Sequence, residues 1–335
     1  MRFAVLGGGA WGTALGNVLA TNKHQVVIYT DRIEVEEEIN KNKTNSKYLG
    51  SDCRLEKTIS ATSDFKKACE NQDGFIISVP TSSYREVLVE LNKHIGKKAY
   101  IVSVGKGFDP LTQMRLSDLI RAIIPESKRY PVVSLLGPSF AKEVIKKQLT
   151  AVTSTSLDLE AAKVIQSVFS NNYFRAYVNR DEIGAEYAAA IKNVIAIASG
   201  ILVGLGYNDD SKAALITRGL NEIARLGTAL GAEIQTFFGL AGVGDLILTC
   251  SSPTSRNYSA GIEIGKADSA DEFMKTYTHT VEGVKTCKII NDKAEKMKID
   301  MPIVSAVYQV LYCGKKPSDI VKKLMNRSLK SEFLQ

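Results

Sequence analysis

Residues 3–12, FAVLGGGAWG, join a short apolar run to the pattern G-x-G-x-x-G, whose glycines are Gly7, Gly9 and Gly12. The pattern alone is common in turns. Here a predicted strand precedes it, a predicted helix follows it, and a second predicted strand ends at Asp31 about 20 residues later. Gly7 allows a tight turn, Gly9 lets a pyrophosphate approach the backbone, and Gly12 permits close packing of helix against strand. The stretch therefore predicts a loop that binds a dinucleotide at a helix N-terminus.

The first half of the chain alternates short β-rich runs with amphipathic segments. Strands are predicted at 3–6, 25–29, 74–79, 99–104, 132–136, 150–155 and 173–178, and helices from Trp11, Ile33, Ser82 and Thr112. Such alternation predicts a mostly parallel, doubly wound sheet. From Asp181 onward the segments are long, rich in alanine, leucine and isoleucine, and without a strand pattern. We therefore expect an α/β dinucleotide-binding domain over residues 1–180 and an all-helical, substrate-binding domain over residues 181–335.

The stretch Glu186–Gly206, EYAAAIKNVIAIASGILVGLG, is apolar and long enough to suggest a membrane span. Lys192 lies inside it, and an ammonium in lipid costs roughly 2.5–3.5 kcal/mol or more. We therefore expect no integral membrane segment and predict the buried centre of a soluble domain. At helical spacing the neighbours of Lys192 are small: Ala185, Ala188, Ala189, Ala196 and Ser199. They leave either room for a ligand or a groove in which another helix packs, with Lys192 then extending outward.

The composition is that of a globular protein and favours neither a secreted, disulfide-linked protein nor a metalloprotein. The apolar fraction of 44% and the charged fraction of 24% are those of an ordinary globular protein. The start has no signal-peptide pattern, and the five cysteines form no CxxC pair, so we expect free thiols in a reducing cytoplasm. The three scattered histidines predict no metal site.

The formal net charge is +7, and the segment from Lys285 to Lys330 has eleven basic and four acidic residues. Its lysines fall at helical spacing opposite Ile289, Ile290 and Val304. This pattern predicts a solvated helix face rather than a nucleic-acid site. Attraction to anionic membrane surfaces is the alternative.

Two loops follow predicted strands at their carboxyl ends, where open α/β sheets bind ligands. In the first loop Lys106 stands between two glycines, and in the second Gly137 is followed by Ser139. We expect Ser139 to cap the helix that follows it. The alternative for Lys106 is an ordinary surface lysine.

The helical half adds a carboxylate and an anion site. Asp245 lies among apolar residues and should be paired with a cation. In the segment 251–257, SSPTSRN, we expect Ser252 to cap a helix, Pro253 to begin it, and Arg256 to lie one turn in. Free backbone amides and a guanidinium then form a phosphate site. The alternative is an ordinary capped helix with an exposed arginine.

Six segments resemble NAD(P)-dependent glycerol-3-phosphate dehydrogenase of the bacterial cytoplasmic type: GGGAWGTALG, SVGKGF, LLGPSFAKEV, AAAIKNVIAIASGI, GVGDLILTCSSPTSRNY and VEGVKT. They occur in order from residue 3 to about residue 290. The resemblance implies a Rossmann-like domain followed by a helical domain like that of 6-phosphogluconate dehydrogenase. It also implies a cytoplasmic homodimer that interconverts sn-glycerol 3-phosphate and dihydroxyacetone phosphate, supplying the backbone of phospholipids.

The resemblance also implies roles for single residues. Lys192 matches the proton acceptor. The substrate contacts implied are Lys106, Gly137, Ser139, Lys192, Asp245, Ser255, Arg256 and Asn257. The loop pattern predicts Gly7, Gly9, Ala10, Gly12 and Asp31 as NAD or NADP contacts, and the resemblance adds Trp11, Arg32, Tyr48, Lys106, Ala141, Arg256, Thr280 and Glu282. Asp31 stands where many members of the family have a basic or neutral residue. Asp31 favours an unphosphorylated ribose whereas Arg32 favours a 2′-phosphate, so a preference for NAD is expected with NADP left open.

The mechanism implied is hydride transfer from C2 of the substrate to the nicotinamide while a neutral Lys192 takes the hydroxyl proton. Burial and the nearby cation Lys106 would lower the pKa of Lys192, and Asp245 would raise it. Lys106 would polarise the carbonyl oxygen and Arg256 would hold the phosphate. Two alternatives remain: a 3-hydroxyacid dehydrogenase, which needs a carboxylate anchor instead, and a non-catalytic NAD(H) sensor, which needs no proton relay.

Overall fold

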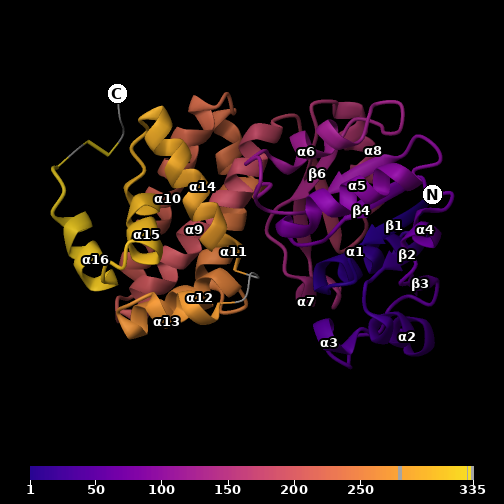
Figure 1. The fold of residues 1–335 in the computed structure, drawn as a ribbon, viewed down its shortest axis with the longest axis horizontal. Helices are drawn as coiled ribbons and strands as arrows, with labels where there is room; N and C mark the ends of the chain where they lie inside the picture. The colour runs from indigo at the N-terminus through magenta and orange to yellow at the C-terminus, as the bar shows by residue number, and fades with distance from the viewer. Residues whose placement is uncertain (278–280, 330, 333–335) are drawn as a thin grey trace. The chain divides into compact units, whose positions relative to one another are not determined.

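The computed structural model describes residues 1–277, 281–329 and 331–332. The chain folds into two compact units, shown in Figure 1. The first unit comprises Met1–Ala189 and Gly227–Asp245, and the second comprises Ala190–Leu226 and Leu246–Gln335. The division into functional domains at residue 180 stays a prediction, because packing alone does not assign functions to the units.

An eight-stranded sheet forms the centre of the first unit, with strand order β3-β2-β1-β4-β5-β6-β7-β8. The strands are β1 (Arg2–Leu6), β2 (Gln25–Tyr29), β3 (Ile59–Thr62), β4 (Gly74–Ile77), β5 (Tyr100–Ser103), β6 (Val133–Leu136), β7 (Thr150–Thr155) and β8 (Phe174–Asn179). Only β6 and β7 pair in antiparallel fashion. The mostly parallel, Rossmann-like sheet predicted from the sequence is confirmed, and β3 is an additional strand.

Helices cover both faces of this sheet, as Figure 1 shows around β1 and β4. They are α1 (Ala10–Thr21), α2 (Ile33–Asn42), α3 (Ser46–Leu49), α4 (Phe65–Cys69), α5 (Tyr84–His94), α6 (Leu116–Ile123), α7 (Ala141–Val144) and α8 (Leu159–Phe169), with a short 3-10 turn, η1 (Thr81–Ser83), before α5. Along β1, Phe3 and Val5 pack into one core cluster while Ala4 and Leu6 pack into the other. The sheet is therefore buried on both sides, as a doubly wound fold requires.

Among the helices that alternate with the strands, one starts a full turn later than predicted, whereas the other predicted starts lie within two residues of the observed ones. The helix expected from Thr112 begins at Leu116. The Asp109 carboxylate accepts hydrogen bonds from the Thr112 amide at 2.9 Å and from the Thr112 hydroxyl at 2.5 Å. Because these bonds hold residues 109–112 in a turn, the helix starts one turn later than its apolar pattern suggests.

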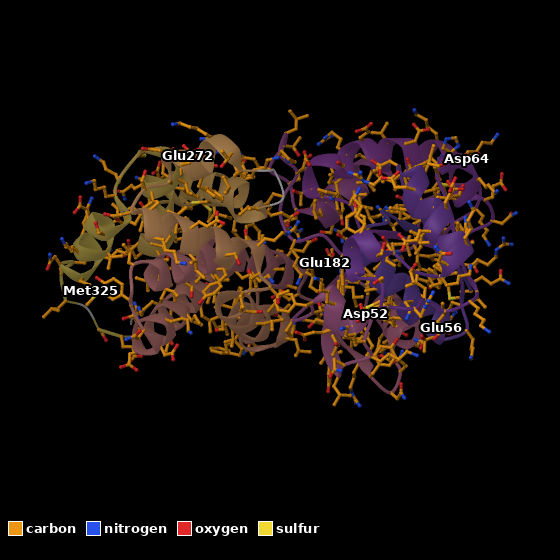
Figure 2. All side chains as sticks on the ribbon, turned by 90° about the horizontal axis from the view of Figure 1, so that it is seen from below. Asp52, Glu56, Asp64, Glu182, Glu272 and Met325 are labelled. Carbon is orange, nitrogen blue, oxygen red and sulfur yellow. The ribbon has the colours of Figure 1, made fainter. Side chains whose placement is uncertain are left out.

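Helix α9 (Glu182–Gly204) is the one helix in the described part of the chain that is long and apolar enough to cross a membrane, and 83% of its apolar window is buried inside the protein. Its first two turns belong to the first unit. There Arg121 binds Glu182, labelled in Figure 2, at 2.6 Å, and Arg115 binds Glu186 at 3.1 Å. These buried ion pairs need protein partners, which supports the prediction of a core helix.

The second unit is built from helices. After the larger part of α9 come α10 (Asp209–Ala229), α11 (Asp245–Ser251), α12 (Arg256–Ala267), α13 (Asp271–Thr276), α14 (Glu282–Met297), α15 (Pro302–Tyr312) and α16 (Pro317–Met325). Between α10 and α11, η2 (Ile234–Phe238) and the π-turn η3 (Leu240–Gly244) pack with the first unit. No strand follows Asn179 in the described residues, which confirms the helical second half.

The basic segment of the second unit has the predicted solvated face. Lys288 and Lys296 are exposed, whereas Ile290 and Val304 are buried. At the end of α16, Met325 points outward from the unit and is 81% exposed (Figure 2).

Helices α9 and α12 cross with backbone against backbone. A Cβ atom on Gly200 would lie 2.9 Å from the Cα of Gly261, and one on Gly204 would lie 2.8 Å from the Cα of Gly265. Since real Cβ atoms do not approach other atoms so closely, only glycine fits at these four positions. The glycine-rich end of α9 therefore serves close helix packing.

Candidate active site

The dinucleotide loop leaves its helix N-terminus open. Gly9 is the N-cap of α1, with φ −75° and ψ −176°, and no side chain caps the helix. A Cβ atom on Gly9 would meet no described atom within 4 Å, whereas Gly7 has φ +118° and its Cβ would collide with the Ser78 carbonyl. The first turn of α1 has no acidic residue. Free amides, open space and the helix dipole fit the pyrophosphate of a dinucleotide.

Asn45 supports this loop from the segment before α3, and sequence reasoning missed it. Its side chain is fully buried, and Nδ2 donates to the Gly8 carbonyl at 2.9 Å and to the Thr13 hydroxyl at 2.8 Å. These bonds fix the turn between β1 and α1. An asparagine ahead of a short helix gives no sequence signal of such a distant contact.

The other predicted cofactor residues are spread over several elements. Asp31 and Arg32 are exposed at the start of α2, where Arg32 is the N-cap and lies 3.7 Å from Glu34. The half-buried members are Ala10 and Trp11 at the start of α1, Tyr48 on α3, Ala141 on α7, and Glu282 at the start of α14 in the second unit. Gly12 is buried in the first turn of α1. Thr280 lies outside the described residues.

Lys106 and Asp245 form a buried ion pair in the first unit. The ammonium donates to Asp245 Oδ2 at 2.8 Å and to the Gly137 carbonyl at 3.0 Å. The Asp245 side chain is 1% exposed and that of Lys106 is 18% exposed. The prediction that Asp245 pairs with a cation is confirmed, and the alternative of Lys106 as an ordinary surface lysine is wrong.

Ser139 does not cap α7, contrary to the sequence-based prediction. Phe140 is the N-cap residue, and no side chain caps the helix. The Ser139 hydroxyl instead donates to the Gly137 carbonyl at 3.1 Å. The Gly137 carbonyl thus accepts hydrogen bonds from both Ser139 and Lys106, and these bonds link the loop after β6 to the Lys106 ammonium.

Lys192 is buried in the second unit rather than extended to solvent. It is 4% exposed, and its ammonium donates to the Thr249 hydroxyl on α11 at 2.7 Å. Sequence reasoning missed Thr249, which is itself buried. Its position one helical turn after Asp245 in the sequence is the signal that was available. A buried ammonium in an apolar helix is costly unless polar groups meet it, which marks Lys192 as a functional candidate.

The small residues around Lys192 mostly serve packing. In the first unit Ala185 and Ala189 form a cluster with Leu136 and Ala241. In the second unit the Ser199 hydroxyl donates to the Cys250 carbonyl at 2.8 Å. The alternative that these small residues form a groove in which other segments pack therefore accounts for many of them.

The predicted phosphate site begins three residues later than expected. Ser255, not Ser252, is the N-cap of α12, and its hydroxyl accepts from the Tyr258 amide at 3.3 Å. Ser252 instead accepts from the Thr254 amide at 3.2 Å, in the turn before the helix. Arg256 is the first helical residue and is exposed. The guanidinium therefore stands directly at a helix N-terminus, a favourable place for an anion.

Asn257 connects three segments beside this N-terminus. Its Nδ2 donates to Asn193 Oδ1 on α9 at 3.1 Å, and its Oδ1 accepts from the Gly283 amide on α14 at 2.9 Å. Asn193 was not predicted as a site residue, although it follows Lys192 directly. The two hydrogen bonds link α9, α12 and the start of α14 next to Arg256.

The described residues contain no group of three or more histidine, cysteine or acidic side chains suited to a metal ion. All five cysteines are free thiols, and four are buried. Burial raises the pKa of the Cys69 thiol to about 12, so it stays protonated.

Comparison with known proteins gives consistent matches along the chain. Two family profiles match: NAD-dependent glycerol-3-phosphate dehydrogenase N-terminus over residues 2–162, and the C-terminus of the same family over residues 181–322. The chain is 45% identical over 335 residues to glycerol-3-phosphate dehydrogenase (NAD(P)+) of Ligilactobacillus salivarius (strain UCC118), covering 99% of both chains. It is 47% identical over 326 residues to the enzyme of the same name from Bacillus pumilus (strain SAFR-032), covering 97% of this chain and 94% of that one. A solved structure of glycerol-3-phosphate dehydrogenase from Coxiella burnetii aligns with a TM-score of 0.89 at 32% identity, covering 97% of this chain and 99% of that one.

Proposed function

The chain belongs to the NAD-dependent glycerol-3-phosphate dehydrogenase family, and from this premise we propose that it interconverts sn-glycerol 3-phosphate and dihydroxyacetone phosphate with Lys192 exchanging the proton. It is an NAD(P)-dependent oxidoreductase. The observation that carries the role of Lys192 is its burial, at 4% exposed, with the ammonium bound to the Thr249 hydroxyl. A buried cation whose hydrogen bond fixes its position is suited to proton exchange with one defined substrate atom.

NAD(P)+, when bound, accepts the hydride that leaves carbon C2 of the substrate. In the same step Lys192 Nζ, in its neutral amine form, takes the proton of the C2 hydroxyl, and in the reverse direction the ammonium returns a proton to that oxygen. Thr249 keeps the nitrogen in place through its hydroxyl. Gly9 and the amides at the start of α1 hold the cofactor phosphates, for which the open N-terminus supplies the room.

Lys106 supplies a fixed positive charge to the reacting oxygen. Its bonds to Asp245 and the Gly137 carbonyl hold the ammonium in one position, so it needs little reorganisation during the reaction. Arg256 and the N-terminus of α12 hold the substrate phosphate by charge-assisted hydrogen bonds. A guanidinium at a helix N-terminus binds phosphate and carboxylate alike, so the choice of a phosphate ester over a 3-hydroxy acid rests on the family to which the chain belongs.

We further propose that the product sn-glycerol 3-phosphate enters phospholipid synthesis in the cytoplasm and that the enzyme is a homodimer. The first proposal follows from chemistry, because this compound is the backbone of glycerophospholipids. The second rests on the family resemblance. Light scattering during gel filtration gives the mass in solution, and a mass near 36.5 kDa, that of one chain, would exclude the dimer.

The experiment that tests the reaction follows NADH absorbance after dihydroxyacetone phosphate is added. We expect oxidation of NADH by the natural chain with dihydroxyacetone phosphate, no oxidation with the keto forms of small 3-hydroxy acids, and loss of turnover in Lys192→Ala with NADH binding nearly intact. Lys288→Ala, which removes an exposed lysine of the same unit, is the matched control. Near-normal turnover in Lys192→Ala would refute the proton role. NADH binding by the natural chain without turnover would favour a sensor.

A further inference from the structure

We propose that Tyr84 is a positioning residue of the reaction, whose hydroxyl sets the backbone of the Lys106 loop and through it the Lys106 ammonium. The inference rests on the function proposed above for Lys106. Tyr84 is the first residue of α5 and is fully buried. Its place in the sequence, 22 residues before Lys106 and on another element, gave no indication of this role.

The Tyr84 hydroxyl joins the ends of two strands to the loop that follows them. It donates to the Ile77 carbonyl at 2.8 Å and accepts from the Gly105 amide at 2.9 Å. The Ser103 hydroxyl lies 3.1 Å away. Ile77 and Ser103 are register partners at the carboxyl ends of β4 and β5. The hydroxyl therefore ties the residue before Lys106 to the edge of the sheet.

The hydrogen-bonding capacity of the phenol is used fully. A phenolic oxygen has one hydrogen to donate, which goes to Ile77, and it accepts from Gly105. With that hydrogen committed, Ser103 acts as the donor in its contact with Tyr84. Because Ser103 is also fully buried, water does not replace any of these bonds.

Packing holds the same loop residue from the other side. A Cβ atom on Gly105 would lie 2.6 Å from Leu116 Cδ1, 2.7 Å from the Tyr84 hydroxyl and 2.9 Å from Tyr84 Cε2. The backbone at residue 105 is thus pressed between the tyrosine ring and Leu116. A side chain at residue 105 would therefore force Leu116 or the Tyr84 ring to move.

Lys106 is consequently held at both ends. Its ammonium is fixed by Asp245 and Gly137, and its main chain is fixed through Gly105 and Tyr84. A lysine side chain has four rotatable bonds, so a shift of the main chain at residue 106 would strain or break the bonds that hold the ammonium. The ring of Tyr84 lies in an apolar cluster that phenylalanine would fill equally well. The hydroxyl is the part of the residue that this positioning requires.

The test is a double-mutant cycle between Tyr84→Phe and Lys106→Ala, read as kcat/KM for dihydroxyacetone phosphate. We expect Tyr84→Phe to lower kcat/KM roughly 10- to 100-fold with unchanged NADH affinity, as for a misplaced catalytic group. In the Lys106→Ala background the same change should have no further effect. Tyr173→Phe is the matched control, because the hydroxyl of that buried tyrosine has no hydrogen-bond partner among the described residues.

The outcomes separate this inference from the function on which it rests. If Lys106→Ala keeps full activity, the role proposed for Lys106 fails. If Lys106→Ala loses activity but Tyr84→Phe does not, or if the two losses multiply in the double variant, only the positioning role of Tyr84 is overturned. Should Tyr84→Phe fail to fold, Ser103→Ala replaces it. A severalfold loss of kcat/KM that disappears in the Lys106→Ala background supports the inference, and a loss that persists there overturns it.

Discussion

Replacing Gly9 by alanine should mainly weaken cofactor binding, whereas replacing Gly7 by alanine should mainly lower the stability of the fold. At Gly9 an added methyl group meets no described atom within 4 Å, and φ of −75° is accessible to alanine. At Gly7 the backbone has φ +118° and the methyl group would overlap the Ser78 carbonyl. The two glycines of one motif are therefore needed for different reasons: Gly9 leaves room for the ligand, and Gly7 allows the turn.

The expected magnitudes follow from these contacts. Alanine is a poorer N-cap than glycine, so Gly9→Ala should lower the free energy of unfolding by less than about 1 kcal/mol. Its methyl group occupies the space through which a pyrophosphate reaches the amides of α1, and we expect NADH affinity to fall at least ~10-fold, or about 1.4 kcal/mol. Gly7→Ala adds left-handed strain of about 1–2 kcal/mol to overpacking of about 1–3 kcal/mol, so unfolding should become easier by about 2–5 kcal/mol.

NADH binding is measured by fluorescence titration and stability by urea unfolding of the same preparations. Gly96→Ala is the control, since an added methyl group at this exposed site also meets no described atom within 4 Å. We expect it to change neither quantity. NADH binding by Gly9→Ala with the affinity of the natural chain would refute the placement of the pyrophosphate at this helix.

Three further predictions concern the anchor, the cofactor and pH. Arg256→Ala should raise KM for dihydroxyacetone phosphate roughly 10- to 100-fold with little change in kcat, and a large loss of kcat at unchanged KM would contradict the anchor. Asp31→Ala should raise kcat/KM with NADPH relative to NADH by about 10-fold, and an unchanged ratio would remove Asp31 from ribose recognition. Burial raises the pKa of the Glu222 carboxyl to about 7, above its value near ~4.3 in the unfolded chain, so the unfolded chain releases this proton first. Stability should then fall by about 4 kcal/mol as the pH rises from about 4.3 to 7 and be level above that. Urea unfolding of Glu222→Gln should lack this slope, and an equal slope in both proteins would exclude Glu222 as its source.

The parts of the fold that the sequence predicted are those with strong local patterns. The strands found in advance are short apolar runs such as QVVIY (25–29), whereas β3 (Ile59–Thr62) reads ISAT and has two small polar residues among four. It pairs with β2 alone, at the edge of the sheet, where a continuous apolar run is not needed. The late start of α6 depends on Asp109, which is paired with Arg85 at 2.6 Å. That partner is distant in the sequence.

The sequence likewise predicted some features of the candidate site and not others. Motif spacing and burial predicted the pairing of Asp245 with a cation, because an apolar neighbourhood demands a partner. Both serine caps were misplaced, at Ser139 and Ser252, because a serine hydroxyl can bond backbone groups in a turn as readily as at a helix start. The contacts of Thr249 and Tyr84 join segments far apart in the chain. The spacing of Thr249 from Asp245 hinted at the first contact, whereas no local pattern encodes the second.

The crossing of α9 and α12 affects how the enzyme's specificity can be changed. Because Gly200 and Gly204 pack directly against the backbone of α12, the two helices have no side chains between them whose replacement could bring them closer together. On the roles proposed here, the packing of α9 against α12 sets the distance between Lys192, which exchanges the proton, and Arg256, which holds the phosphate. The length of substrate that fits between proton exchange and phosphate anchor then depends on four glycines that have no side chain to contact it. Engineering toward longer or shorter phosphate esters should therefore begin with this spacing.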